Sequence, residues 1–341
     1  MEIGISEQFP RENFDRRVSV APMMDWTDRH CRYFLRGFSP SVLLYTEMVT
    51  AAAILRGDCE RLLRYSPEEQ PLALQLGGSD PRQLARAARV GAESGYVEIN
   101  LNCGCPSDRV HAGAFGACLM REPARVADCV AAMRAAVRIP VTVKMRIGVL
   151  EQAEHKSIES FGDADYEGLR AFVTALQAAG CRHCIVHARQ AVLGGLSPRE
   201  NREVPPLRYD IVRRLKQDFP LLWIGVNGGL RQLAQCREAL AWADGIMLGR
   251  EAYHRPQILS ELHRELYPHG WCVPDLAAQL DRMAHYAARE SAQGTPLRAI
   301  TRHMLGLANG RPGARRFRQL LAQPPAEFPL RQAVQALEPI P

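Results

Sequence analysis

The stretch PLALQLGGSDPRQLARAARVGAESGYVEINLNCG, residues 71–104, decides the fold of this chain. Two apolar runs, residues 72–77 and 96–104, flank a segment at residues 80–94 in which apolar side chains recur at intervals of three and four. The two runs predict buried strands, and the segment between them predicts an amphipathic helix. A strand, a crossover helix and a second strand form the βαβ unit that is typical of a parallel sheet.

The same alternation extends over the first three-quarters of the chain. Further strand-like runs are found at residues 18–23, 42–49, 141–147, 183–189, 221–228 and 245–249. Helix-like segments are found at residues 123–137, 166–179, 209–218 and 230–241. Eight such strands within roughly 250 residues predict an α/β fold of the closed (β/α)8 TIM barrel type. An open doubly wound sheet competes with this prediction, but it would favour a Gly-rich turn after the first strand, where Ala21 and Pro22 stand instead.

The chain after residue 255 has no further strand-like run. Helical segments are predicted at residues 274–289 and 297–321, so we expect a barrel over residues 1–255 and a helical domain with a tail over residues 256–341. No acidic residue occurs at residues 291–326, and six arginines are found there: Arg298, Arg302, Arg311, Arg315, Arg316 and Arg318. In a helix that begins near Gly313, Arg311, Arg315 and Arg318 would share one face.

The composition is that of an ordinary globular protein. Of its 341 residues, 47% are hydrophobic and 23% are charged, which excludes general disorder. No run approaches the roughly 20 apolar residues of a membrane-spanning helix, and no secretory signal is evident, so we expect a cytoplasmic protein with its ten cysteines reduced. The net charge of +6 includes 40 arginines and three lysines. Arginine-favouring base composition and phosphate recognition by guanidinium groups both explain this bias.

The residues that end the predicted strands are unusual for a purely structural barrel. In this fold the active site forms at the carboxyl ends of the strands. The strand ends carry Pro22, Met23, Met24, Gln75, Asn102, Lys144, His187, Asn227, Gly228, Gly229, Gly249 and Arg250. Glycines after the seventh and eighth strands let backbone N–H groups approach a phosphate, so we expect a phosphorylated cofactor or substrate there. The polar side chains of the other strand ends would then face the body of that ligand.

Cys105 lies in a Gly-Cys-Pro turn before a long loop. A cysteine on a loop at the mouth of a barrel can act as a nucleophile or as a proton donor. The pair Cys181 and Cys184, with His183 and His187 nearby, could indicate a metal or redox site. That interpretation is disfavoured because Cys184 lies inside a predicted strand and no second ligand pair has suitable spacing, so no metal is expected.

Several motifs resemble those of the tRNA-dihydrouridine synthases. They are SVAPMMDWTDR (19–29), EINLN (98–102), GCPS (104–107), VKMR (143–146), HAR (187–189) and NGG (227–229). Three more, GLSPRENRE (195–203), RHMLGL (302–307) and PGAR (312–315), are similar to the A subfamily, which acts on uridines of the tRNA D-loop. The resemblance implies an FMN-binding barrel, a helical tRNA-binding domain and NADPH as the reductant. It implies tRNA as the partner, with positions 20 and 20a as the modified uridines.

The resemblance also implies roles for the strand-end residues. Flavin contacts are implied for Pro22, Met23, Met24, Gln75, Lys144 and His187, and phosphate contacts for Asn227, Gly228, Gly229, Gly249 and Arg250. Reduction of the uracil C5=C6 bond needs a hydride at C6 and a proton at C5, and Cys105 would be the acid. The uridine must leave its stack to reach the barrel mouth, where Asn102 would hold it. The residues implied to grip the tRNA are Arg199, Arg202, Arg315 and Arg318.

Two features depart from the family pattern. Cys103 stands where a valine is usual, and residues 149–167 form a longer connection than is usual in the subfamily. Other function classes remain open at this point. A flavin barrel that reduces a free pyrimidine would not need the arginine-rich C-terminal domain, and a Schiff-base aldolase using Lys144 would be colourless. A non-enzymatic tRNA-binding protein would not need the polar strand ends. No stable protein partner and no membrane contact are expected.

Overall fold

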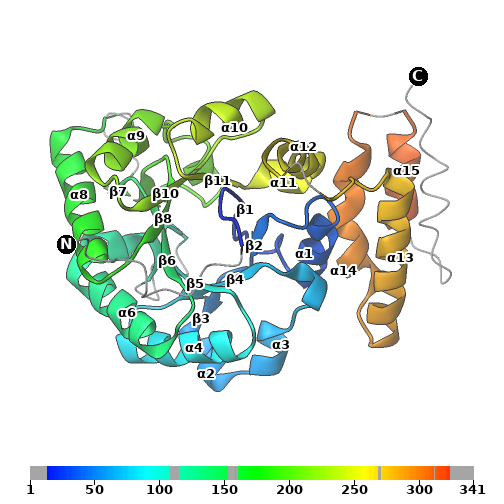
Figure 1. Ribbon diagram of the computed structural model, residues 1–341, viewed down its shortest axis with the longest axis horizontal. Coiled ribbons are helices and arrows are strands. Elements are labelled where there is room, and N and C mark those ends of the chain that lie inside the picture. Colours follow the sequence, from blue (N-terminus) through cyan, green and yellow to red (C-terminus); the bar gives the residue numbers. More distant parts are fainter. Residues whose placement is uncertain are drawn as a thin grey trace, which may run out of the picture.

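A closed ring of parallel strands forms the centre of the molecule in the computed structural model, which describes residues 14–107, 115–152, 158, 160–267, 270–310 and 312–322 (Figure 1). The strands of the ring are β1 (Val18–Val20), β2 (Leu43–Tyr45), β4 (Leu72–Gly77), β5 (Glu98–Cys103), β6 (Val141–Arg146), β8 (His183–His187), β10 (Trp223–Asn227) and β11 (Gly245–Leu248). The sheet closes because β1 pairs with β11 and with β2, and β2 pairs with β4. The predicted TIM barrel is confirmed.

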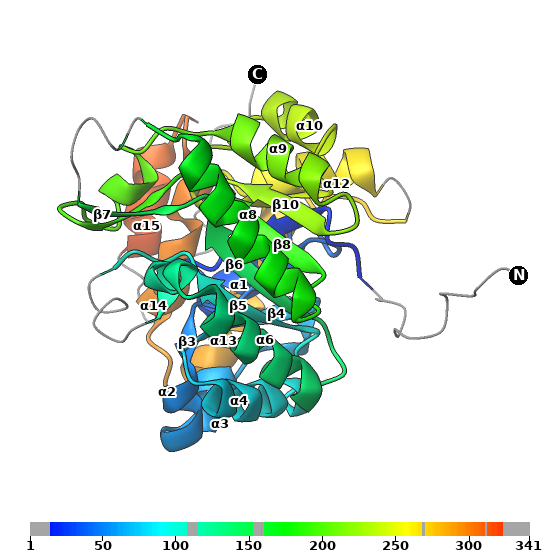
Figure 2. The ribbon, with the colours of Figure 1, turned by 90° about the vertical axis from the view of Figure 1, so that its left-hand side faces the viewer.

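Helices cover the outside of the ring. In chain order they are α1 (Arg29–Arg36), α2 (Ala51–Arg56), α3 (Cys59–Leu63), α4 (Pro81–Glu93), α6 (Pro123–Ala136), α8 (Asp163–Ala178), α9 (Tyr209–Asp218), α10 (Leu233–Leu240), α11 (Arg250–His254) and α12 (Gln257–Leu266). Figure 2 shows α6 and α8 in front of β6 and β8. In α4 the Asp80 side chain accepts the N–H of Gln83 at 2.8 Å and caps the first turn, and the buried residues recur at intervals of three or four.

The first strand is shorter than the sequence predicts. The run at residues 18–23 ends as a strand at Val20 because the chain turns: the N–H groups of Trp26 and Thr27 donate to the carbonyl oxygen of Met23. Asp25 in this turn has a φ of 65°, and its N–H donates to Glu47 Oε1 at 2.5 Å. A non-glycine residue in the left-handed region is uncommon, so this contact helps to hold the loop.

Two further differences concern short strands. The predicted strand at residues 42–49 is divided into β2 and the separate β3 (Val49–Thr50), which pairs with β4. A second sheet of two parallel strands, β7 (Val149–Gln152) and β9 (Ala191–Gly194), was not predicted. β7 lies in the connection that looked long in the sequence, and most of residues 153–159 lie outside the described residues.

Three helices form a lobe at one side of the barrel, next to α1 (Figure 1). They are α13 (Leu276–Ala292), α14 (Leu297–Thr301) and α15 (Ala314–Ala322), with the 3-10 turn η4 (Arg302–Ala308) before α15. The predicted helical segment at residues 297–321 is thus divided, and its last helix begins at Ala314, next to the start considered at Gly313. The ring of Tyr33 in α1 stacks on Tyr286 in α13 at 3.9 Å, and every residue of α1 after Arg29 is buried. The domain boundary near residue 255 stays a prediction.

Asp28 links the barrel to this lobe. Its carboxylate accepts the N–H of Cys31 at 2.9 Å and so caps α1. The same carboxylate accepts a hydrogen bond from Arg302 Nη2 at 2.5 Å and lies 3.0 Å from Nε2 of the buried His303. On the other side of the ring, Nδ1 of His303 lies 3.1 Å from the Tyr253 hydroxyl. One side chain of the barrel thus fixes both a helix start and the contact with η4.

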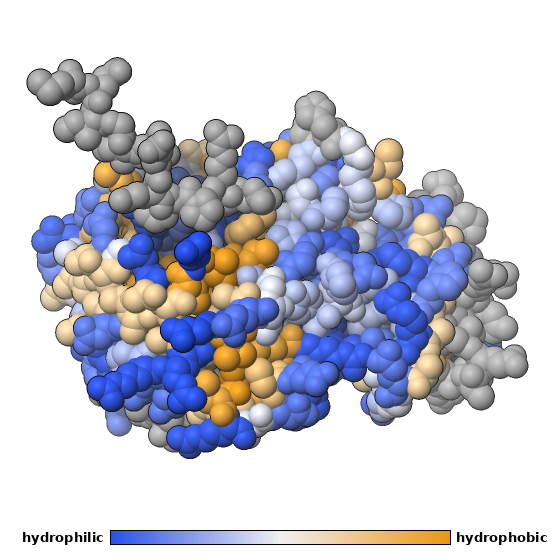
Figure 3. Space-filling model, turned by 60° about the horizontal axis from the view of Figure 1, so that its bottom comes forward, coloured by the Kyte–Doolittle hydropathy of each residue, from blue (hydrophilic) through white to orange (hydrophobic). Residues whose placement is uncertain are grey.

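Hydrophilic side chains dominate the surface where the C-terminal lobe meets the barrel, whereas hydrophobic ones gather on the barrel itself in the view of Figure 3.

None of the described helices combines the length and the apolar character that a bilayer crossing needs.

Candidate active site

The carboxyl ends of five neighbouring strands bring most of the predicted polar residues to one mouth of the barrel. In register, Gln75 pairs with Asn100, Asn102 with Lys144, and Asn227 with His187. The Lys144 Nζ atom donates to Asn227 Oδ1 at 3.1 Å, and Asn227 Nδ2 donates to the carbonyl oxygen of Met247 at 2.6 Å. These contacts cross the end of the barrel and place the side chains of β4, β5, β6, β8 and β10 around one space.

The amide of Asn102 holds the turn that carries Cys105 at its two first N–H groups. Asn102 Oδ1 accepts the backbone N–H groups of both Gly104 and Cys105 at 3.0 Å. The partly buried Cys105 Sγ lies 3.4 Å from the hydroxyl of Ser107. The amide of Asn102 also donates from Nδ2 to Gln75 Oε1 at 2.8 Å. Asn102 therefore fixes the start of the predicted catalytic loop, whose residues 108–114 lie outside the described part of the chain.

Lys144 lies in a site that disfavours its positive charge. Burial lowers the pKa of its amine to about 7, and repulsion by Arg146 acts in the same direction, while the charge of Cys105 opposes both. No carboxylate pairs with Lys144 within the described residues, and its hydrogen-bond partner is the neutral amide of Asn227. An anion bound next to Lys144 would therefore restore the charge of the amine.

Arg146 connects β6 to β8 and to the Cys105 turn. Its Nε donates to the carbonyl oxygen of Gly104 at 3.2 Å, and Nη1 lies 3.2 Å from His187 Nδ1. Nη1 also donates to the carbonyl oxygen of Asn201 at 3.0 Å. No role of Arg146 was predicted from the sequence. Its position at a strand end was the available signal, but its contacts with segments far along the chain appear only in the fold.

Gly228 lies against His187 in a conformation that suits glycine. Its φ is +112°, and a Cβ atom at this position would lie 3.3 Å from His187 Nε2. Gly229 follows with a φ of +70°. A Cβ atom at Gly229 would overlap the Leu207 side chain, so both the backbone conformation and the packing favour glycine here. The phosphate contact of this turn stays a prediction.

Arginines surround one carboxylate at the edge of the mouth. Arg250 Nη1 donates to Glu203 Oε1 at 2.5 Å, and the Arg199 side chain, 80% exposed, lies 3.8 Å from Glu203. Burial lowers the pKa values of Arg189 and Arg202, and the charge of Arg250 lowers both further. The predicted residues Arg199, Arg202 and Arg250 thus lie together, with more positive than negative charge between them.

The loop after β1 lies beside the start of α11. The Met24 side chain is 53% exposed, and a Cβ atom at Gly249 would lie 3.8 Å from the sulfur of Met23. Pro22, Met23 and Met24 therefore lie next to the β11 end, and their flavin contacts stay a prediction. Arg315 and Arg318 lie elsewhere, on the exposed face of α15, whose Phe317 and Leu321 are buried. Arg311 lies outside the described residues.

The description "Dihydrouridine synthase (Dus)" belongs to the family model that matches residues 19–337. The chain belongs to the dihydrouridine synthase family. It is 55% identical over 327 residues to the tRNA-dihydrouridine(20/20a) synthase of Pseudomonas aeruginosa, covering 95% of both chains. It is 53% identical to the protein of the same name from Escherichia coli (strain K12), covering 90% of this chain and 86% of the relative.

Among solved structures, a 2-naphthoyl-CoA reductase in complex with 2-naphthoyl-CoA shares the fold. The TM-score is 0.53 at 10% sequence identity, with 73% of this chain and 50% of that chain covered. At this identity the likeness concerns the barrel architecture alone.

The other cysteines of this dihydrouridine synthase are mostly buried thiols. Cys103, the departure from the usual valine, is fully buried, and burial raises its pKa well above the ordinary value. A thiol in this environment is unreactive. Cys181 and Cys184 are buried as well. Among the residues that the structure describes, no group of three or more His, Cys, Asp or Glu side chains could hold a metal ion.

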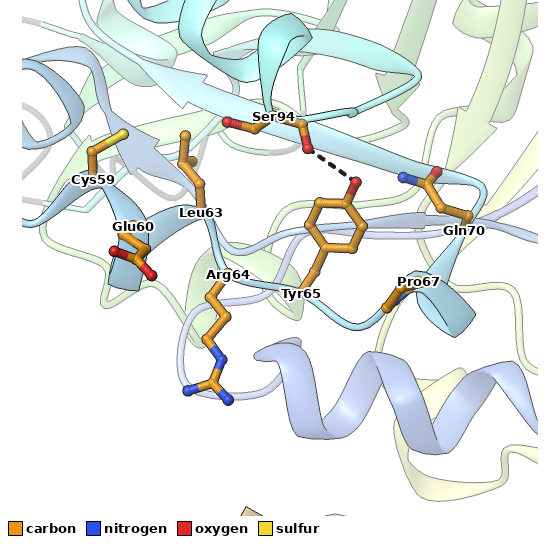
Figure 4. A pocket seen from close by; sticks show the side chains of 8 residues that line it. All are labelled: Cys59, Glu60, Leu63, Arg64, Tyr65, Pro67, Gln70 and Ser94. Carbon is orange, nitrogen blue, oxygen red and sulfur yellow. Dashed lines mark hydrogen bonds between the residues drawn. The ribbon is translucent and has the colours of Figure 1, made fainter. Parts of the chain in front are cut away.

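A pocket of about 490 Å³ lies at the opposite end of the synthase barrel, beside the residues that precede β4 and β5 (Figure 4). Its lining includes Cys59, Arg64 and Tyr65, whose hydroxyl donates to the carbonyl oxygen of Ser94 at 3.0 Å. None of the predicted site residues lines this pocket. The candidate active site is therefore the mouth at the carboxyl strand ends.

Proposed function

We propose that this dihydrouridine synthase reduces the C5=C6 bond of the uridines at positions 20 and 20a of the tRNA D-loop, with FMN as its bound cofactor and NADPH as the reductant. The relatives that carry this activity in their names match nearly the whole chain. The observation that carries the chemistry is the position of Cys105, which Asn102 holds at the end of β5 near the Arg146 side chain.

The strand-end residues fit a flavin phosphate. Arg250 repels both Arg189 and Arg202, and a phosphate dianion would relieve that repulsion. Gly228 and Gly229 form a turn with two positive φ values, and the backbone N–H groups of such a turn would bind the phosphate. The phosphate would be held by Asn227, Gly228, Gly229, Gly249 and Arg250, and the ring by Pro22, Met23, Met24, Gln75, Lys144 and His187. When bound and reduced, the flavin supplies a hydride to uracil C6.

Cys105 completes the reduction as the acid. Its S–H bond breaks as a C–H bond forms at uracil C5, so the sulfur is left as a thiolate. Arg146, whose Nε donates to the carbonyl oxygen of the adjacent Gly104 at 3.2 Å, supplies a positive charge near that thiolate. The partly buried thiolate then recovers a proton from solvent. The protein thereby supplies the proton and the electrostatic stabilisation for the step.

The substrate contacts follow from the size of tRNA. The uridine must be extruded from its stack to reach Cys105, and Asn102 holds the ring at the barrel mouth. Arg199 and Arg202 at the mouth and Arg315 and Arg318 on α15 bind the phosphate backbone around it. The helical domain at residues 256–341 serves as the tRNA-binding domain, and the enzyme acts where tRNA is found, in the cytoplasm.

Mapping of dihydrouridine in tRNA tests this function directly. We expect tRNA from a strain that lacks the gene to lose dihydrouridine at positions 20 and 20a by mass spectrometry, and plasmid-borne wild-type protein to restore it. The Cys105→Ala variant, expressed at the same level, should not restore it. Dihydrouridine that persists at 20 and 20a, or is lost at another position instead, would overturn the assignment. A colourless purified protein with no flavin in its acid extract would overturn the cofactor.

A further inference from the structure

Polar side chains form a continuous hydrogen-bonded series from the Cys105 turn into the interior of the barrel. The series, here called the polar series, consists of Asn102, Gln75, Asn100, Thr142 and Glu98. The Asn102, Gln75 and Asn100 side chains are connected by hydrogen bonds of 2.8 and 2.7 Å. The next bonds, from Asn100 to Thr142 and from Thr142 to Glu98, measure 2.8 and 2.6 Å. All five residues are buried, and the last three are 0% exposed.

Glu98 sets the direction of these hydrogen bonds. Its carboxylate forms an ion pair with Arg16 and accepts the Tyr45 hydroxyl at 2.5 Å. An ionised carboxylate accepts hydrogen bonds and cannot donate them. The Thr142 hydroxyl must therefore point its hydrogen at Glu98, which leaves an oxygen lone pair for the next member of the series.

The direction of the Thr142 hydrogen bond determines how the amides of Asn100 and Gln75 are oriented. Because the Thr142 oxygen is left as an acceptor, the Nδ2 group of Asn100 faces it and Oδ1 faces Gln75. Gln75 consequently donates from Nε2 to Asn100, and its Oε1 faces Asn102. A reversed amide at either position would place two donors or two acceptors opposite each other in a buried site, where no water replaces the lost bond.

The series ends at the backbone of the predicted acid. Since Nδ2 of Asn102 is directed at Gln75, its Oδ1 is directed at the N–H groups of Gly104 and Cys105, both at 3.0 Å. With the amide reversed, an NH2 group would face two N–H donors and the turn would lose both bonds. The rotamer of Asn102 that shapes the Cys105 turn thus depends on a carboxylate four hydrogen bonds away.

We propose that Glu98 and Thr142 are positioning residues for Cys105: they fix the orientation of the Asn102 amide and through it the turn that presents the thiol. This inference rests on the proposed role of Cys105 as the acid. Neither residue was a predicted site residue. The signal in the sequence was the period-two repeat of Glu98, Asn100 and Asn102 along one face of β5.

The test compares Thr142→Val with Thr142→Ser. Valine keeps the branched shape and removes the hydroxyl, whereas serine keeps the hydroxyl and removes a methyl group. The first measurement is alkylation of Cys105 by iodoacetamide, followed by mass spectrometry of its peptide, with the exposed Cys272 as the internal reference. The second is the single-turnover rate of uridine reduction by enzyme whose flavin has been reduced beforehand.

In Thr142→Val we expect Cys105 to be alkylated faster by about threefold or more, because the released turn exposes the sulfur. We expect its single-turnover rate to fall by about tenfold or more. Thr142→Ser should stay within about twofold of the wild type in both measurements, since it keeps the donor to Glu98. Unchanged alkylation and turnover in Thr142→Val would overturn the inference, as would equal changes in the two variants.

The two measurements separate this inference from the proposed function. If wild-type enzyme fails to reduce tRNA but Cys105 alkylation rises only in Thr142→Val, the positioning role stands and the function fails. If Thr142→Val does not fold, Glu98→Gln is measured in the same way, because its amide removes the charge that sets the direction. Alkylation of Cys105 at the wild-type rate in folded Glu98→Gln would overturn the inference.

Discussion

The Nη1 atom of Arg146 lies 3.2 Å from Nδ1 of His187, and a guanidinium only donates hydrogen bonds, so Nδ1 carries no proton. Burial, followed by the charges of Arg146 and Lys144, holds the pKa of His187 well below its ordinary value. The imidazole is therefore neutral at pH 7, with its proton on Nε2, the atom next to Gly228. It presents a neutral donor at the barrel mouth.

This tautomer should be visible by NMR. We expect the imidazole nitrogens of His187 in the flavin-free protein to show no titration between pH 5.5 and pH 8, because the charged form is disfavoured throughout that range. The measurement is a nitrogen-15 long-range correlation spectrum of histidine-labelled protein, with His187→Gln to assign the signals. Protonation of His187 with a midpoint near its ordinary pKa of about 6.5 would contradict the prediction.

Lys144 should take up a proton when the anionic cofactor binds. Its pKa of about 7 in the free protein lies below the ordinary 10.5, so at pH 8 the amine is mostly neutral. A bound anion raises the pKa, and we expect uptake of up to about one proton per FMN at pH 8. Calorimetry in two buffers of different ionisation enthalpy measures this uptake. Lys144→Met should lose it, and equal uptake in Lys144→Met would exclude Lys144 as its source.

The same shift makes stability depend on pH. Between pH 7 and pH 10.5 the unfolded chain holds the Lys144 proton that the folded chain has lost. The contribution of Lys144 to the free energy of unfolding therefore rises with pH across this window and is lowest below pH 7. Lys144→Met should flatten this part of the pH profile in urea denaturation of the flavin-free protein.

Removal of the Cys105 thiol should separate the two half-reactions. We expect Cys105→Ala to bind FMN and tRNA and to be reduced by NADPH at the wild-type rate, because the thiol acts only on uracil C5. Reduction of uridine should fall by about 100-fold or more, the usual contribution of a general acid. Stopped-flow absorbance follows the flavin in both steps. Cys59→Ala, at the opposite end of the barrel, is the matched control, and near-full activity of Cys105→Ala would remove Cys105 as the acid.

The arginines of α15 should bind phosphates. We expect the double variant Arg315→Ala, Arg318→Ala to weaken tRNA binding by about tenfold and to reduce the slope of log affinity against log salt by about 1.5, since two phosphate contacts are lost. The control is Arg86→Ala, Arg89→Ala, which removes two exposed arginines at the same spacing from α4. Binding is measured by fluorescence anisotropy at several salt concentrations. An unchanged slope in the α15 variant would show that these arginines do not contact the tRNA.

Loss of the Asp28 carboxylate should destabilise the protein more than loss of a simple helix cap. Burial alone would raise the pKa of Asp28, but the hydrogen bond and charge of His303 outweigh it and hold the pKa well below 3.8. The resulting stabilisation is present above pH 3.8 and is lost as the pH falls. We expect Asp28→Ala to lower the free energy of unfolding by about 3 kcal/mol at pH 7. Asp80→Ala, which removes only a cap, should cost about 1 kcal/mol, and equal losses would argue against the link to η4.

The barrel could be predicted because each strand is a local apolar run between turn residues. The run at residues 72–77 coincides with β4, and the predicted strand ends contain the residues that line the mouth. Strand β1 was predicted too long because Thr27 and Trp26, outside the run, turn the chain back on Met23. The pairing of β7 with β9 depends on segments about 40 residues apart, and two strands of four residues each carry little pattern of their own.

The contacts that organise the site could not be predicted in the same way. Arg146 binds Gly104 and His187 across neighbouring strands, and its strand-end position alone does not reveal either partner. The ion pair of Asp28 joins residues 274 positions apart. Such pairs form between segments that are distant in the sequence and meet only in the folded barrel. A periodic pattern within one segment therefore does not predict them. The polar residues at the strand ends could therefore be predicted as a set, but the hydrogen bonds and ion pairs between them could not.

Helix α1 belongs to two cores at once. Its residues after Arg29 are all buried, with Tyr33 stacked on Tyr286 of the C-terminal lobe and Arg32 paired with Glu69 of the barrel. A chimera that joins this barrel to the C-terminal helices of another synthase would place a foreign surface against Tyr33. The natural recombination unit is therefore discontinuous: exchange of the tRNA-binding helices requires exchange of α1 as well, and a graft made at a single junction near residue 255 should misassemble.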